Sequence, residues 1–157
     1  KVDVEYRTLR DKVLTKNEYE KIIFLMFNKY DFDPLLIQEL IFFGRQNLKE
    51  LSDDGHLIGL HTHNHPFQLE KFSRDKQLNE YTKNKMILEE IINKEIITMS
   101  HPNGSYNSDT LDILNDFDLR IGFKASMHLD RNMKDYNQSK FEIMREDHTN
   151  ILKLMIG

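Results

Sequence analysis

The chain has 157 residues, of which 39% are hydrophobic and 31% charged, and its formal net charge is −4. This length suffices for one domain with a sizeable core, and the composition is that of a globular chain, neither disordered nor membranous. A negative net charge gives no support to nucleic-acid binding, which usually leaves a basic surface. No apolar run approaches the ~18 residues that a membrane-spanning helix needs. We therefore expect a single domain over residues 1–157, with no nucleic-acid partner and no transmembrane segment.

Cysteine is absent, so the chain has no disulfide framework, thiolate metal ligand or thiol nucleophile. Any bound metal must be held by nitrogen and oxygen ligands. The lack of cysteine fits a reducing cytoplasm, which is the location we expect, while a periplasmic or cell-surface location stays open. The chain starts at Lys1 with no initiator Met and no secretory signal, so we expect it to be part of a longer protein. The oligomeric state is open.

The first third of the chain has helical patterns. Residues 17–28 place apolar side chains on one face at helical spacing. Pro34 suits a helix start, and apolar residues continue from there to Gly44. Residues 46–52 suggest a short helix that Gly55 ends. We interpret residues 1–55 as a mostly helical cover.

From residue 56 onward, short apolar runs alternate with helical patterns. Ser73 can cap one long amphipathic helix, and Ser108 starts another. The short runs predict four buried strands, at residues 56–61, 96–99, 120–125 and 141–144. Strands that alternate with helices argue for an α/β domain with parallel pairing. We expect residues 56–150 to form its core.

Three of the seven histidines, His61, His63 and His65, fall within five residues at the end of the first predicted strand. If the strand continued, all three would share one face; if the chain turns, His61 and His65 can meet. Neutral imidazole binds zinc, iron, cobalt or nickel, and α/β proteins usually keep their sites at strand ends. The alternative is a group of solvated or hydrogen-bonded histidines. We favour a metal site, because catalytic metal sites use this ligand type and grouping.

The segment Gly59–Pro66, read Gly-Leu-His-Thr-His-Asn-His-Pro, resembles the His-Ser/Thr-x-x-His motif of polysaccharide deacetylases, the NodB-homology family. Segments 100–107, 122–123 and 144–147 resemble later motifs of that family in the right order. The resemblance implies that His61 and His65 are metal ligands. It also implies that the substrate-binding groove includes Pro102, Asn103, Gly104, Tyr106, Arg145 and Asp147. Ser100 stands where many members have Arg, and Asn103 where Tyr or Phe is usual.

The resemblance further implies a fold and a reaction. The fold would be a NodB-like distorted (β/α) barrel, incomplete here, with the helical N-terminal part as an insertion or cover. The cofactor would be a divalent metal, zinc first, with cobalt, nickel or iron as alternatives. Such an ion activates water and polarises an acetyl carbonyl, while backbone N–H groups near the Pro-Asn-Gly turn hold the oxyanion. The partner would be an acetylated carbohydrate of a bacterial surface glycan or its precursor, with the sugar and the N- or O-linkage open.

The family's catalytic base, an Asp at the end of its first strand, has no match in this chain. The letters of 52–55, Ser-Asp-Asp-Gly, imitate it but follow a helical pattern, and residues 30–34 fit a turn and helix start better. We leave the catalytic residue unassigned, expect it upstream of Lys1, and expect the 157-residue chain to be inactive or nearly so. Two alternatives stay open: an inactive deacetylase-like carbohydrate-binding or scaffold domain, and an unrelated histidine-rich metal-binding domain.

Other polar residues in these segments have two interpretations each. His101 is a substrate contact or a solvated loop histidine. Arg145 and Asp147 orient an active-site carboxylate or form an ordinary surface ion pair. We interpret His56 and His128 as structural.

Overall fold

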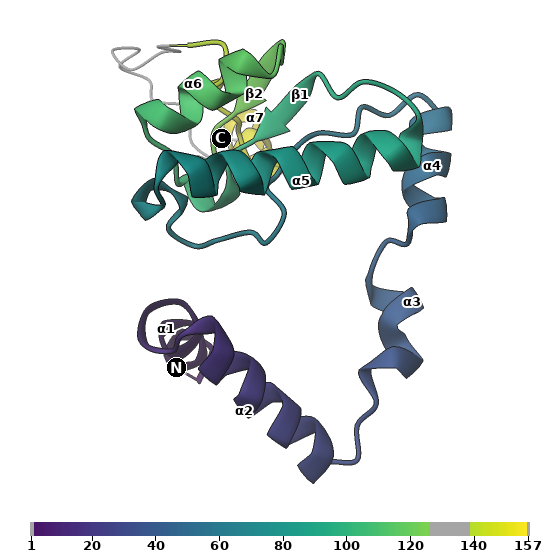
Figure 1. The fold of residues 1–157 in the computed structure, drawn as a ribbon, viewed down its shortest axis with the longest axis vertical. Coiled ribbons are helices and arrows are strands. Elements are labelled where there is room, and N and C mark those ends of the chain that lie inside the picture. Colours follow the sequence, from purple (N-terminus) through teal and green to yellow (C-terminus); the bar gives the residue numbers. More distant parts are fainter. Residues whose placement is uncertain (1, 126–138, 157) are drawn as a thin grey trace. The chain divides into compact units, whose positions relative to one another are not determined.

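The computed structural model describes residues 2–125 and 139–156, which form two compact units, Lys1–Gly44 and Arg45–Gly157 (Figure 1). His128 lies outside the described residues. Whether the chain acts as one domain, with 1–55 as a cover over a 56–150 core, stays a prediction. Across the described part of the chain, no helix has both the length and the apolar character needed to cross a membrane.

The first unit is helical throughout. It contains α1 (Val2–Thr8), the π-helix η1 (Leu9–Val13), α2 (Lys16–Lys29), the 3-10 helix η2 (Pro34–Ile37) and α3 (Gln38–Ile41). The helix predicted at 17–28 is confirmed by α2, which begins with a capping box between Thr15 and Glu18. The turn and helix start predicted at 30–34 are also confirmed, because the Asp33 carboxylate accepts a hydrogen bond from the N–H of Leu35 at 2.9 Å.

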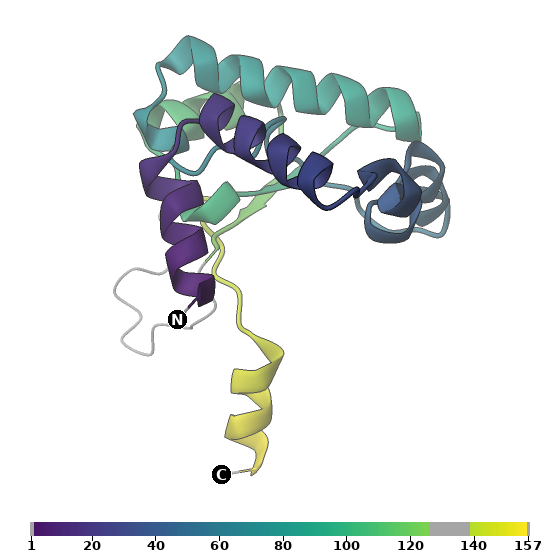
Figure 2. The same cartoon turned by 90° about the horizontal axis from the view of Figure 1, so that it is seen from below.

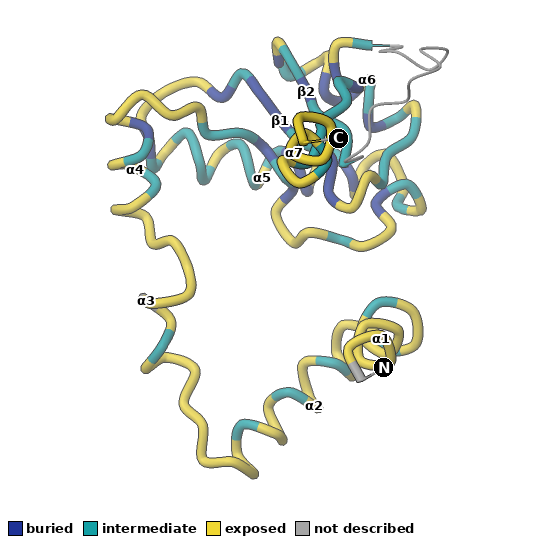
Figure 3. The backbone as a smooth tube through the Cα atoms, turned by 180° about the vertical axis from the view of Figure 1, so that it is seen from behind, coloured by how far each residue is buried: buried dark blue, intermediate teal, exposed yellow. Residues whose placement is uncertain are grey.

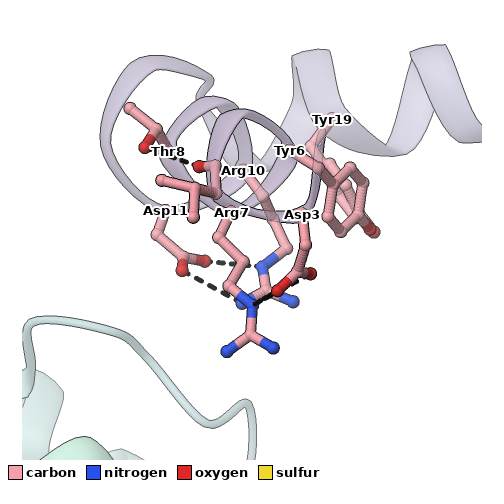
Figure 4. A network of polar contacts seen from close by, with 8 residues as sticks. Asp3, Tyr6, Arg7, Thr8, Arg10, Asp11 and Tyr19 are labelled. Atoms are coloured by element: carbon pink, nitrogen blue, oxygen red, sulfur yellow. Dashed lines mark hydrogen bonds and ion pairs between the residues drawn. The ribbon is translucent and has the colours of Figure 1, made fainter. Parts of the chain in front are cut away.

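Polar pairs accompany the α1 and η1 helices, for which the sequence shows no clean apolar period (Figure 4). Arg7 pairs with Asp3 one turn earlier at 3.0 Å, and the Arg10 guanidinium lies 2.6 Å from the Asp11 carboxylate. The Tyr6 and Tyr19 hydroxyls lie 2.8 Å apart and join the two helical segments. None of the side chains described in residues 3–44 is buried (Figure 3), so local signals rather than a core accompany these helices.

The second unit holds a small parallel sheet and its helices. The helices before the sheet are α4 (Arg45–Asp53), η3 (Leu69–Lys71) and α5 (Arg74–Ile92). Strand β1 (Thr98–Ser100) is followed by η4 (Pro102–Gly104), α6 (Ser108–Asp116), strand β2 (Ile121–Phe123) and α7 (His148–Ile156). The two strands are parallel, with Thr98 opposite Ile121. Parallel α/β pairing is thus confirmed, and the strands predicted at 96–99 and 120–125 correspond to β1 and β2.

The two outer strands are shorter than predicted. In place of strands at 56–61 and 141–144, the sheet has single parallel bridges, Leu60 with Met99 and Ile143 with Phe123. At the first of these segments Leu57 is 73% exposed, and Thr62, just past the predicted end of the strand, has φ 65°, so the backbone leaves the sheet early. Within the described residues the sheet stays open, as expected for an incomplete barrel.

The core of this unit lies between the sheet and the helices α5 and α6 (Figures 1 and 2). Its buried apolar residues are Leu60, Leu69, Tyr81, Ile92, Ile96, Met99, Ile113, Leu114, Leu119 and Phe141. Gly122 is required at the centre of β2, because an added Cβ would lie 2.7 Å from Met99 Sδ and 2.9 Å from Phe141 Cα. The close approach of the neighbouring segments thus depends on this glycine.

Helix ends follow local signals in different ways. The α6 helix begins at Ser108, as predicted, and Asn107 caps it through a capping box with Thr110. Ser73 precedes α5 as predicted, but its side chain makes no capping hydrogen bond. The α7 helix was not predicted; the Asp147 carboxylate accepts a hydrogen bond from the N–H of Thr149 at 2.7 Å at its start. In Figure 2, α7 extends beyond the strands.

Candidate functional site

The segment from His61 to His65 is a tight turn at the end of the first sheet segment. Thr62 has φ 65° and His65 has φ 49°, both in the left-handed region. A β-branched residue such as Thr62 is a rare outlier there. Each non-glycine residue held in this region costs on the order of 1–3 kcal/mol of conformational free energy. The turn brings the His61 and His65 rings together, with centroids 4.8 Å apart and planes at 55°. His63 is exposed. Of the two geometries considered, the chain adopts the one in which His61 and His65 meet.

The His61 ring has a defined tautomer. Its Nδ1 lies 2.8 Å from the carbonyl oxygen of Ser100 and 3.0 Å from the Ser100 hydroxyl. A carbonyl oxygen only accepts, so Nδ1 donates its proton and Nε2 keeps a free lone pair. Burial lowers the pKa of His61 below its ordinary value, against the opposing effect of the Ser100 carbonyl. A neutral imidazole oriented by a carbonyl is the state in which histidine binds metals.

Two side chains of α5 hold this turn. The Asn84 amide oxygen accepts a hydrogen bond from the N–H of His61 at 2.9 Å. Glu80 Oε2 accepts from the N–H groups of His63 at 3.1 Å and Asn64 at 2.7 Å, and Oε1 accepts from the Asn64 side-chain amide at 2.7 Å. Neither Glu80 nor Asn84 was predicted from the sequence to belong to the site. The sequence feature that could have identified them is their spacing, because polar residues four apart on a helix lie on the same face.

The Pro-Asn-Gly turn of η4 follows the end of β1. Pro102 is buried, while Asn103 and Gly104 adopt φ values of 53° and 71°. Asn is among the few non-glycine residues that favour this region, which suits Asn103 to its place in the turn. The N–H groups of Gly104 and Ser105 donate within the turn, to the carbonyls of His101 and Pro102.

A buried polar cluster lies next to this turn. His101 is 1% exposed, its ring stacks on Tyr106 with centroids 4.1 Å apart, and its Nε2 donates to the Phe141 carbonyl at 2.9 Å. The Tyr106 hydroxyl donates to the buried Glu142 carboxylate at 2.8 Å. Burial lowers the pKa of His101 to about 4 and, together with Glu142, raises the pKa of Tyr106 to about 12. The interpretation of His101 as a solvated loop histidine is therefore wrong.

The predicted groove residues of the last segment have structural contacts as well. Arg145 Nε donates to the Lys124 carbonyl at 2.8 Å, which ties the segment to the end of β2. Asp147 starts α7, as described above. Their roles toward a substrate stay predictions, as do those of Pro102 and Tyr106.

The Asp-Asp-Gly letters at 53–55 belong to the end of a helix, as interpreted from the sequence. Asp53 lies in the last turn of α4, with its carboxylate 2.6 Å from Lys49 Nζ. The hydrogen bond from Lys49 lowers the pKa of Asp53. This ion pair is at the surface and gives Asp53 an ordinary partner.

The imidazole side chains at the turn are a ligand type that divalent metals bind. His61 is a neutral imidazole with a free Nε2, and the His65 ring lies beside it. Within residues 2–125 and 139–156, no three or more His, Asp or Glu side chains gather into a metal-binding group. The described residues therefore bring together two imidazole rings, those of His61 and His65, and their role as metal ligands stays a prediction.

Parallel strands with polar side chains at their carboxyl ends define an α/β domain of the class that places its site there. The family model for polysaccharide deacetylases matches residues 10–122, which is more than half of the chain. The chain belongs to the polysaccharide deacetylase family. The resemblance inferred from the histidine motif is thus confirmed, and the match extends into the helical first third. A search of curated proteins found no match.

Solved structures show the same fold. The deacetylase PplD of Streptococcus pyogenes, in complex with acetate, has a TM-score of 0.59 and 21% identity, covering 99% of this chain and 78% of its own. The deacetylase domain of BpsB from Bordetella bronchiseptica has a TM-score of 0.54 and 16% identity, covering 67% of this chain and 48% of its own. The polysaccharide deacetylase BC0361 from Bacillus cereus has a TM-score of 0.52 and 18% identity, covering 66% of this chain and 31% of its own. The chain spans less than half the length of the last two.

Proposed function

We propose that the protein is a metal-dependent hydrolase that removes acetyl groups from a carbohydrate. The observation that carries the proposal is the His61 and His65 pair, with its rings 4.8 Å apart and His61 Nδ1 bound to the Ser100 carbonyl. Family membership supports the deacetylase reaction.

The first part of the proposed site is the histidine pair that would hold the metal ion. His61, through Nε2, and His65 would hold a divalent ion, with zinc first and cobalt, nickel or iron as alternatives. Such an ion, when bound, lowers the pKa of its water and polarises the acetyl carbonyl. The Ser100 carbonyl keeps the proton of His61 on Nδ1, so that the other nitrogen stays available. The carboxylate that acts as general base is not assigned.

The Pro-Asn-Gly turn supplies the second part of the site. Pro102 has no N–H, and the N–H groups of Gly104 and Ser105 donate within the turn. The N–H of Asn103 is therefore our choice for holding the oxyanion of the acetyl group. We assign Pro102, Gly104, Tyr106, Arg145 and Asp147 to the substrate-binding groove, as the resemblance to the family implies.

Metal binding is the primary test, because it does not depend on the unassigned base. We expect Zn²⁺ titrated calorimetrically into the full chain to bind with a one-to-one stoichiometry. His61→Ala and His65→Ala should each weaken binding by roughly tenfold or more, since each removes a ligand. His63→Ala is the matched control, because His63 lies in the same turn and is exposed. Equal affinities in all four proteins would show that the metal site is misplaced.

Acetate release separates the enzyme from its alternative. The protein assayed must contain the general base. With that protein, we expect a panel of N- and O-acetylated oligosaccharides to include a substrate, and we expect His61→Ala to abolish the release of acetate. Carbohydrate binding with no acetate release, by a protein that contains the general base, would instead support a carbohydrate-binding or scaffold domain.

A further inference from the structure

The Glu80 carboxylate is a buried group that the proposed chemistry does not use. It lies in the second turn of α5 with 6% of the residue exposed, and both of its oxygens face the turn that carries the histidines. Three donors of the turn converge on it, the N–H groups of His63 and Asn64 and the Asn64 side-chain amide. A single side chain thus binds the middle of the segment between His61 and His65.

This turn needs an external anchor. Its Thr62 and His65 have positive φ, and such conformations persist only where surrounding structure enforces them. The buried Thr62 hydroxyl has no hydrogen-bond partner among the described residues, so it does not stabilise the turn itself. Glu80 binds the two residues that lie between the two strained ones, and Asn84, one helical turn later, binds the N–H of His61.

The chemistry of the anchor favours a carboxylate. Glu80 Oε2 accepts from two backbone N–H groups while Oε1 accepts from a third donor. A carboxylate has only acceptor sites and forms charge-assisted bonds, which are the stronger ones. The single oxygen of a glutamine would accept from the two backbone N–H groups without the negative charge that strengthens these bonds, and its NH₂ group would face the Asn64 side-chain amide.

We infer that Glu80 is a positioning residue, which holds the turn in the conformation where His61 and His65 face one ion, with Asn84 as its helper. Glu80 contacts neither imidazole in this role; it acts through the backbone of His63 and Asn64. Its effect on the backbone is independent of the proposed function, whereas its effect on metal affinity rests on it.

Two measurements on the full chain test the inference: amide hydrogen exchange of His63 and Asn64 without metal, and Zn²⁺ affinity by calorimetry. We expect Glu80→Gln to raise exchange at both amides by tenfold or more and to weaken Zn²⁺ binding by about tenfold. Glu90→Gln is the matched control, because Glu90 is an exposed carboxylate of the same helix, paired with Arg45. It should change neither quantity by more than about twofold.

A second pair of variants guards against loss of folding. Asn84→Ala removes the acceptor for the His61 N–H, whereas Asn84→Asp keeps one, so the alanine variant should lose Zn²⁺ affinity and the aspartate variant should recover most of it. Unchanged exchange and affinity in Glu80→Gln, while His61→Ala loses the metal, would refute the role of Glu80 alone. Equal Zn²⁺ affinity in wild type, His61→Ala and His65→Ala would refute the metal site, and with it the proposed function, whatever the exchange data show.

Discussion

Acid should destabilise the second unit through one buried histidine, His101. Its ring is 1% exposed and stacked on Tyr106, and burial lowers its pKa from 6.5 to about 4. The unfolded chain binds a proton at this ring more readily than the folded chain does. The stability that neutral His101 contributes is therefore fully present above the unfolded pKa and is lost as the pH falls from 6.5 toward 4.

The magnitude follows from the two pKa values. At about pH 5 the unfolded imidazole is almost fully protonated, whereas only about a tenth of the folded imidazole is. The free energy of unfolding should then be lower by about 2 kcal/mol than at about pH 7.5, from this group alone. His61, whose pKa is also lowered by burial, shifts the stability in the same direction.

A matched variant isolates the contribution of His101. Glutamine does not titrate, and its amide nitrogen can donate to the Phe141 carbonyl that His101 Nε2 now binds. We would measure urea unfolding by far-ultraviolet circular dichroism at about pH 7.5 and about pH 5 for wild type and His101→Gln. Wild type should lose about 2 kcal/mol more than the variant, because the effect of His61 cancels. Equal losses in the two proteins would refute the burial of a neutral ring at this position.

Three further substitutions test the packing and the helix starts. Gly122→Ala should lower the free energy of unfolding by about 1–3 kcal/mol, because the new Cβ overlaps Met99 and its neighbours; a urea midpoint equal to that of wild type would contradict the close packing of β2. Asn107→Ala should cost about 1 kcal/mol by removing the cap of α6, whereas Ser73→Ala should cost less, since Ser73 makes no capping hydrogen bond. The reverse order in thermal melts would show that these caps are wrongly assigned.

Much of the architecture was predictable from the sequence, because helices and strands depend on local spacing. The apolar period of 17–28 and the Pro34 signal correspond to α2 and η2, and the runs at 96–99 and 120–125 correspond to the parallel pair β1 and β2. Where the local signal was charge rather than apolar period, as in α1, the prediction failed. The end strands were predicted too long because an apolar run does not say where the backbone turns away from the sheet.

The motif at 59–66 identified the family without any structure, since its spacing places two histidines within reach of each other. Tertiary structure alone decided how they meet. The turn that joins His61 to His65 is held by Glu80, and the ring of His61 is oriented by Ser100, 39 residues later. Likewise His101 is buried because its partner, the Phe141 carbonyl, comes from a segment 40 residues away. Burial, tautomer and pKa depend on contacts between distant segments, and a local pattern of residues does not encode them.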